Sequence, residues 1–95
     1  MTALDEIAAE RQRQIDAEGW DHGHDDTHEH GELAMAAAAY ALQCGFGRFS
    51  TDAPPNFWPW DRRWWKVKDP RRNLIRAAAL IVAEIERLDR KGRHS

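Results

Sequence analysis

Two short segments of this chain carry side chains that could do chemistry. The first, residues 21–32, holds four histidines and five carboxylates. Imidazole with carboxylate can bind zinc, manganese, iron or nickel, and carboxylates alone suit magnesium. The second, residues 57–68, holds four tryptophans and four cations, and such rings can stack a base while the cations reach phosphates. The sequence therefore contains a candidate metal site and a candidate nucleotide site.

Spacing selects the candidate metal ligands. On a helix, His28 and Glu32 share one face four residues apart, and Glu29 lies three residues before Glu32. Acids near the end of the third predicted helix could face this pair if the two helices pack antiparallel. Helix capping and solvated acidity explain the same residues equally well. The metal ligands under this interpretation are His24, Asp25, His28, Glu29, Glu32, Glu86 and Asp89.

The aromatic and basic segment favours a small anionic ligand. Arg71 and Arg72 lie in the first turn of the third predicted helix, whose free N–H groups also favour an anion. The rings could instead close the open end of a core that is rich in alanine, and we expect two or three of them to be structural. The predicted ligand-binding residues are Trp58, Trp60, Arg62, Arg63, Trp64, Trp65, Lys66, Lys68, Arg71 and Arg72.

Helical patterns position both segments, and the sequence predicts an all-α fold. We expect one small three-helix domain over residues 1–95, with a loop rich in tryptophan and proline over 45–69. Thr2 and Gly19 bound the first helix, Asp26-Thr27-His28-Glu29 reads as a capping box that opens the second, and Asp69-Pro70 opens the third. The expected helices span residues 3–18, 27–44 and 70–90.

The third predicted helix carries an apolar repeat. Leu74, Ala78, Ile81, Ile85 and Leu88 recur at alternating steps of four and three, which is typical of a helix-packing seam or a coiled coil. A chain of 95 residues is near the size at which oligomerisation adds needed burial. We therefore expect a homo-oligomer.

Charge and cysteine content limit the classes of binding partner and the cellular compartment that we expect for this protein. Residues 1–32 hold ten of the 16 acids and residues 48–76 hold eight of the 14 bases, yet the net charge is only −2, so nucleic acid is not expected as a partner. The single Cys44 fits a reducing compartment. No secretory signal is visible, and the longest apolar run, residues 33–42, is too short to span a bilayer. We expect a cytoplasmic protein without a membrane partner.

Two short motifs resemble those of a known enzyme family. Glu29-His30-Gly31-Glu32-Leu33-Ala34 and the later Glu86-Arg87-Leu88-Asp89 are similar to the ExxE…ExxD pattern of the all-helical MazG-type nucleotide pyrophosphohydrolases. That family uses such acids to hold magnesium against a nucleotide triphosphate. The resemblance implies a magnesium- or manganese-dependent hydrolase, in which His24 or Asp25 would assist a water.

A broader pattern covers most of the chain. Its segments are Glu10-Arg11-Gln12-Arg13-Gln14-Ile15, Glu18-Gly19-Trp20, His24-Asp25-Asp26, His28, Gly31-Glu32-Leu33-Ala34, Trp58-Pro59-Trp60-Asp61, Trp64-Trp65 and Ala83-Glu84-Ile85-Glu86-Arg87-Leu88-Asp89-Arg90. Together these segments resemble a family of short phage and prophage proteins. The resemblance implies a viral accessory role, and small phage proteins commonly block a host defence effector or sequester a nucleotide signal.

Three functions follow from these observations. The leading hypothesis is a counter-defence protein that binds and sequesters a phosphorylated or cyclic nucleotide, without turnover and without a required cofactor. The alternative is the metal-dependent nucleotide pyrophosphohydrolase, which needs magnesium or manganese. The third is a protein–protein inhibitor of a host defence effector, in which the tryptophans anchor the interface.

Overall fold

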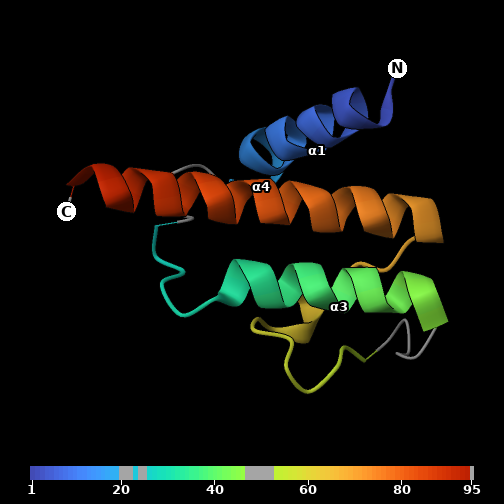
Figure 1. The fold of residues 1–95 in the computed structure, drawn as a ribbon. Helices are drawn as coiled ribbons and strands as arrows, with labels where there is room; N and C mark the ends of the chain where they lie inside the picture. The colour runs from blue at the N-terminus through green and yellow to red at the C-terminus, as the bar shows by residue number, and fades with distance from the viewer. Residues whose placement is uncertain (20–22, 24–25, 47–52, 95) are drawn as a thin grey trace.

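The computed structural model describes residues 1–19, 23, 26–46 and 53–94. Within these ranges the chain forms helices α1 (Ala3–Glu18), α3 (Glu32–Phe46) and α4 (Pro70–His94), one 3-10 turn, η1 (Arg62–Trp64), and no strand. Figure 1 shows α3 and α4 running antiparallel side by side, while α1 crosses α4 on its other side. The predicted all-α, three-helix fold is confirmed. No helix in the described ranges is both long and apolar enough to cross a membrane.

Local capping explains the bounds of α1, which agree with the predicted 3–18. The Thr2 hydroxyl accepts a hydrogen bond from the Asp5 amide at 3.1 Å, and the Asp5 carboxylate accepts one from the Thr2 amide at 3.0 Å. This reciprocal pair satisfies two of the N–H groups that a helix start leaves open. At the other end Gly19 takes the left-handed conformation, with φ 72°, and its N–H donates to the carbonyl of Gln14.

The other two helices correct the predicted bounds. Helix α3 begins at Glu32 rather than at residue 27, so the expected capping box at Asp26-Thr27-His28-Glu29 is wrong. Gly31 has φ 84°, and a left-handed residue interrupts a right-handed helix, which leaves 26–31 as turns. Helix α4 continues to His94 instead of residue 90. It passes through Gly92, because one glycine costs only about 1 kcal/mol relative to alanine in a helix.

Small side chains let α3 and α4 pack closely. Ala36 and Ala39 are fully buried on α3, and Ala77 and Ala83 are buried on α4. Leu33 and Leu80 are the only large aliphatic side chains among the described residues that are less than 2 % exposed. The helix pair therefore supplies little apolar bulk, and the connection between α3 and α4 supplies the rest as aromatic rings.

Candidate functional site

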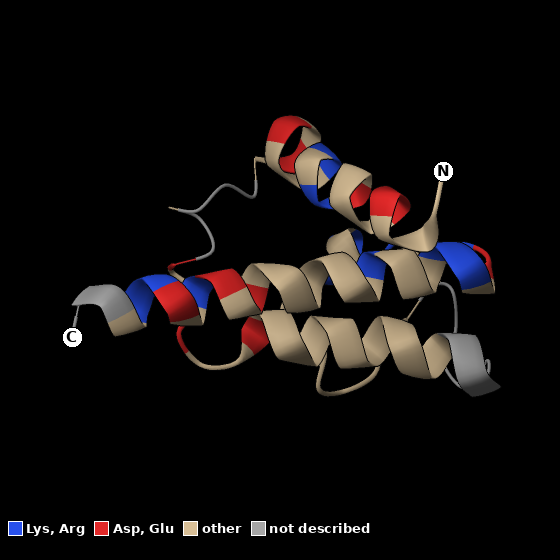
Figure 2. Ribbon diagram, turned by 45° about the horizontal axis from the view of Figure 1, so that its top comes forward, with Lys and Arg blue, Asp and Glu red and all other residues tan. Residues whose placement is uncertain are grey.

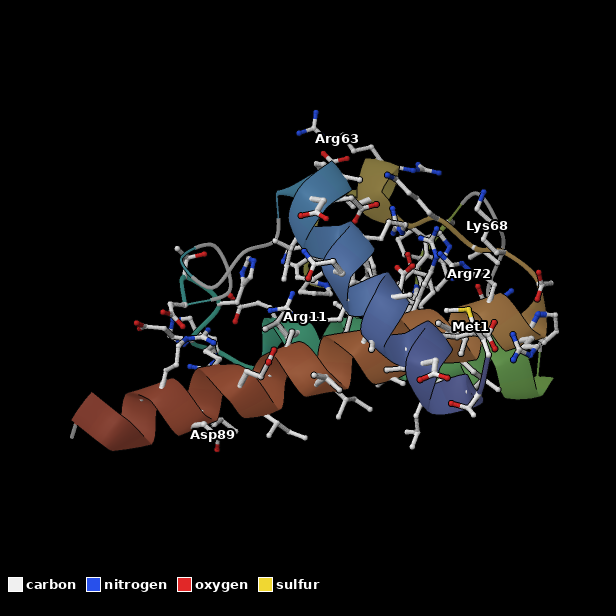
Figure 3. The ribbon with its side chains drawn as sticks, turned by 90° about the horizontal axis from the view of Figure 1, so that it is seen from above. Met1, Arg11, Arg63, Lys68, Arg72 and Asp89 are labelled. Carbon is white, nitrogen blue, oxygen red and sulfur yellow. The ribbon has the colours of Figure 1, made fainter. Side chains whose placement is uncertain are left out.

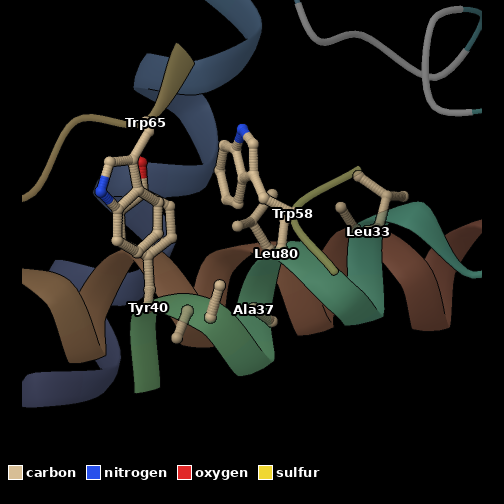
Figure 4. Packing of buried hydrophobic residues seen from close by; sticks show 10 residues of the cluster. Leu33, Ala37, Tyr40, Trp58, Trp65 and Leu80 are labelled. Atoms are coloured by element: carbon tan, nitrogen blue, oxygen red, sulfur yellow. The ribbon is translucent and has the colours of Figure 1, made fainter. Parts of the chain in front are cut away.

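Two of the four tryptophans in the predicted ligand site belong to the core. Trp58 is 8 % exposed and Trp65 is 5 % exposed. Tyr40 of α3 stacks on Trp65 with ring centroids 5.0 Å apart, and Trp58 meets both rings edge-on, at 5.5 Å and 4.9 Å. Figure 4 shows these rings lying over α3. Their burial removes Trp58 and Trp65 from the surface that a ligand could reach.

Trp60 extends this cluster toward the start of α3. Its partly buried ring lies 5.4 Å from Trp58 and 5.2 Å from the imidazole of His28, measured between centroids. His28, predicted as a metal ligand, is therefore in ring contact with the aromatic cluster. The expectation that two or three tryptophans are structural agrees with these contacts.

Hydrogen bonds hold the aromatic and basic segment, residues 57–68, together and against α3. The Tyr40 hydroxyl donates to the Trp64 carbonyl at 3.3 Å and accepts from the Lys66 amide at 3.0 Å. The Trp58 indole N–H donates to the Asp61 carbonyl at 3.2 Å, and the Asp61 carboxylate caps η1 by accepting from the Arg63 amide at 2.9 Å. Burial raises the pKa of the Tyr40 hydroxyl, so it stays a neutral donor and acceptor at physiological pH.

Helix α1 supplies carboxylates to three of the cations that were predicted to bind a ligand. Arg71 donates two hydrogen bonds to Glu6, Arg72 donates to Glu10, and the Lys66 ammonium lies 3.3 Å from Glu18. Figure 3 shows Arg72 beside α1. The N-terminal end of α4 was expected to bind an anionic ligand. In the structure, Arg71 and Arg72 at this end pair with carboxylates of α1 instead.

Glu10 is the centre of this ion-pair layer, and sequence reasoning did not single it out. Its fully buried side chain accepts hydrogen bonds from Arg13 at 2.8 Å, from Gln14 at 3.2 Å and from Arg72. Burial raises the pKa of Glu10, but the hydrogen bond from Arg13 and the charges of Arg13, Arg72 and Arg76 outweigh it and hold that pKa below its ordinary value. The i, i+3 spacing of Glu10 and Arg13 was a visible signal, whereas Arg72 lies too far along the chain to be recognised.

An open surface remains around η1. The Arg63 guanidinium and the Lys66 ammonium lie 5.3 Å and 5.2 Å from the centroid of the Trp64 ring. The three residues line a depression of about 440 Å³. Trp64 is partly exposed, and Arg62 and Lys68 are exposed nearby in the chain. Figure 3 shows Arg63 projecting outward from η1, near the end of α1. We call Arg63, Trp64 and Lys66 the Trp64 surface.

Arginines of α4 pair with two carboxylates at the end of the molecule that holds the 26–31 turn. Arg87, only 6 % exposed, lies 2.6 Å from Glu84, and Arg90 lies 2.7 Å from Asp26. The hydrogen bond to Glu84 raises the pKa of Arg87 most, burial opposes it, and the charges of Glu84, Glu29 and Asp26 raise that pKa further. A depression of about 230 Å³ at this end is lined by Asp26, Glu29, Arg87, Arg90 and Lys91. Figure 2 shows both signs of charge interleaved on this part of α4.

The two acidic pairs predicted to share a metal do not face each other. Glu32 lies 3.4 Å from the His28 imidazole, but Glu86 turns to Arg11 of α1 at 3.1 Å. Figure 3 shows Asp89 on the edge of α4 that points away from the 26–31 turn. Among the described side chains, no three His, Cys, Asp or Glu residues gather as metal ligands. His24 and Asp25 lie outside the described residues.

Comparison of the chain with family models, curated proteins and solved structures gave no match. Both resemblances noted in the sequence therefore stay expectations.

Proposed function

We propose that this protein binds a phosphorylated or cyclic nucleotide on the Trp64 surface and holds it without turnover. The observation that carries the proposal is the position of two cations, 5.3 Å and 5.2 Å from the centroid of a partly exposed indole ring, at an open depression. A base can stack on such a ring, and phosphate oxygens can pair with the flanking cations.

Binding requires a local exchange of partners. Both cations already interact with the ring, and Lys66 also lies 3.3 Å from Glu18. An incoming base must displace a cation from the ring, while the phosphate attracts the displaced cation. Stacking contributes about 1–3 kcal/mol per base. Because the cationic part of the site is exposed, affinity should fall as ionic strength rises.

The biological role that fits this binding is sequestration of a nucleotide signal. The likeness to short phage proteins supports a counter-defence context, and binding without turnover needs no metal. The hydrolase is a separate candidate, but Glu86, one of its expected metal ligands, pairs with Arg11 instead.

Calorimetric titration with mono-, tri- and cyclic nucleotides tests the proposal. Trp64→Ala and Arg63→Ala should each weaken binding by about tenfold or more, since each removes roughly 1.4 kcal/mol or more of stacking or charge pairing. Arg71→Ala is the matched control, because Arg71 is an exposed cation already bound to Glu6. Failure of every nucleotide to bind contradicts the proposal, and so does equal loss in Arg63→Ala and Arg71→Ala.

Recovery of the ligand separates sequestration from hydrolysis. After incubation with magnesium or manganese and heat denaturation, the nucleotide should be recovered intact. Release of pyrophosphate that disappears in Glu32→Gln would contradict sequestration and support the hydrolase.

A further inference from the structure

Helix α4 exposes an apolar face that neither α1 nor α3 covers. Leu74, Ile81, Ile85 and Leu88 are 48 %, 49 %, 52 % and 51 % exposed. Together with the half-buried Ala78 they form what we call the α4 stripe. Helices α3 and α1 pack on the remaining faces of α4, where Leu80 and Ala83 are buried. An aligned apolar stripe of this kind on a small protein marks an interaction surface.

We propose that two copies of this chain pair α4 against α4 in antiparallel orientation along the α4 stripe. The 4-3 spacing of the stripe is the repeat with which one helix packs its side chains between those of another. A two-fold interface brings the same residues from both copies together, so the stripe must be complementary to itself.

The antiparallel arrangement provides that complementarity. With the two-fold axis at the level of Ala83, Ile81 of one copy meets Ile85 of the second copy. Leu88 then meets Ala78, and Leu74 meets Gly92 of the second copy. Large side chains thus meet small ones at both ends of the stripe, which is how well-packed layers interdigitate. A Cβ at Gly92 would touch no atom within 4 Å, so the space beside it is open to receive Leu74.

A parallel arrangement brings like charges together. In a parallel pair, a residue that flanks the seam on one helix faces the residue five positions later that flanks the seam on the other helix. Glu84 would then oppose Asp89 of the second copy, twice in each dimer. The starts of both helices would also lie together, and parallel helix dipoles repel. In the antiparallel register the two Glu84 side chains lie near each other once, at the two-fold axis, and each is paired with its own Arg87. The antiparallel orientation therefore has fewer like-charge contacts than the parallel one.

Solution mass tests the pairing. Each chain is 11.0 kDa, and light scattering after gel filtration should give twice that mass for the wild type. The double variant Ile81→Glu, Ile85→Glu should raise the dimer dissociation constant by roughly a hundredfold or more, because it places charges in the seam. Its helical circular dichroism should be unchanged. Ala9→Glu, at an exposed position of α1, is the control and should remain dimeric.

Disulfide trapping tests the orientation. In a Cys44→Ser background, Ala78→Cys combined with Leu88→Cys should give a covalent dimer on oxidation, since these positions meet across the antiparallel pair. Each single cysteine variant should stay uncrosslinked. Crosslinking by either single variant would show a parallel pair and overturn the proposal, as would a monomeric wild type at every concentration or a dimeric double glutamate variant.

Discussion

The two neighbours of α4 are held to it by different physical forces. Toward α3 the contact consists of alanines, Leu80 and the aromatic rings laid over them. Toward α1 it is built from charged groups, with Glu10 and Arg11 buried and Arg72 half-buried. Figure 2 shows charge along α1 and at both ends of α4, while α3 carries no charged residue after Glu32. The α3 side depends on shape and burial, and the α1 side depends on the presence of both partners in each ion pair.

This difference has consequences for stability. Burying a large aromatic side chain contributes about 3 kcal/mol. A buried ion pair contributes little net free energy, because desolvation opposes the attraction, but removing one partner is costly. We therefore expect α1 to separate from α4 more readily than α3 does, and more so in acid.

The largest effect should come from the aromatic side. Trp58→Ala should lower the free energy of unfolding by about 3–5 kcal/mol, because it empties the centre of the ring cluster. Urea denaturation followed by circular dichroism measures this change. Trp64→Ala, which removes a partly exposed ring, is the control and should lower the free energy of unfolding by clearly less than Trp58→Ala does. Similar losses in the two variants would contradict the assignment of Trp58 to the core.

The ion-pair layer should respond next. Glu10→Gln should lower the free energy of unfolding by about 3 kcal/mol, because it leaves the surrounding arginines without their buried counter-charge. Hydrogen exchange should rise mainly in α1 amides and little in α3. Glu6→Gln is the matched control, since the Glu6 side chain is 29 % exposed and its partner Arg71 is 64 % exposed, and such a pair is worth about 0–1 kcal/mol. Equal effects of the two substitutions would contradict the central role of Glu10.

Acid should act on the same layer. The pKa of Glu10 and that of Glu6 lie below their ordinary value of 4.5 in the folded chain. A lowered folded pKa adds stability above the unfolded pKa, and this stability is lost as pH falls through the folded pKa. The protection of α1 amides, measured as their hydrogen-exchange rate relative to that of an unfolded chain at the same pH, should therefore fall below about pH 4.5 before the protection of α3 amides does. Glu10→Gln should flatten this dependence, and an unchanged pH profile would contradict the role of Glu10.

The smallest effect should come from a residue that joins the aromatic side to the Trp64 surface. Tyr40→Phe keeps the ring in the cluster but removes the hydroxyl that contacts Trp64 and Lys66. We expect a loss of about 1 kcal/mol, measured by thermal unfolding, together with weaker nucleotide binding. An unchanged unfolding curve would show that the hydroxyl does not hold the segment in place.

Much of the secondary structure could be predicted from local signals. The capping pair of Thr2 with Asp5, and Asp69 accepting from the Arg72 amide at 3.0 Å, involve residues three positions apart. Such contacts are decided by neighbours in the chain. The start of α3 was missed because its capping signal competed with Gly31, and a sequence pattern does not show which of the two prevails.

By itself the sequence determined the all-α fold, the bounds of α1 and the apolar repeat along α4. Only the tertiary structure decided which partners the cations take and which rings are buried. Arg72 and Glu10 are 62 residues apart, and Arg11 and Glu86 are 75 apart. Pairs at such separations form only where two helices cross, and the crossing depends on the packing of the whole chain. Motif spacing therefore predicted acids meeting acids for a metal, whereas in the folded chain Glu86 pairs with Arg11 and Glu32 pairs with His28.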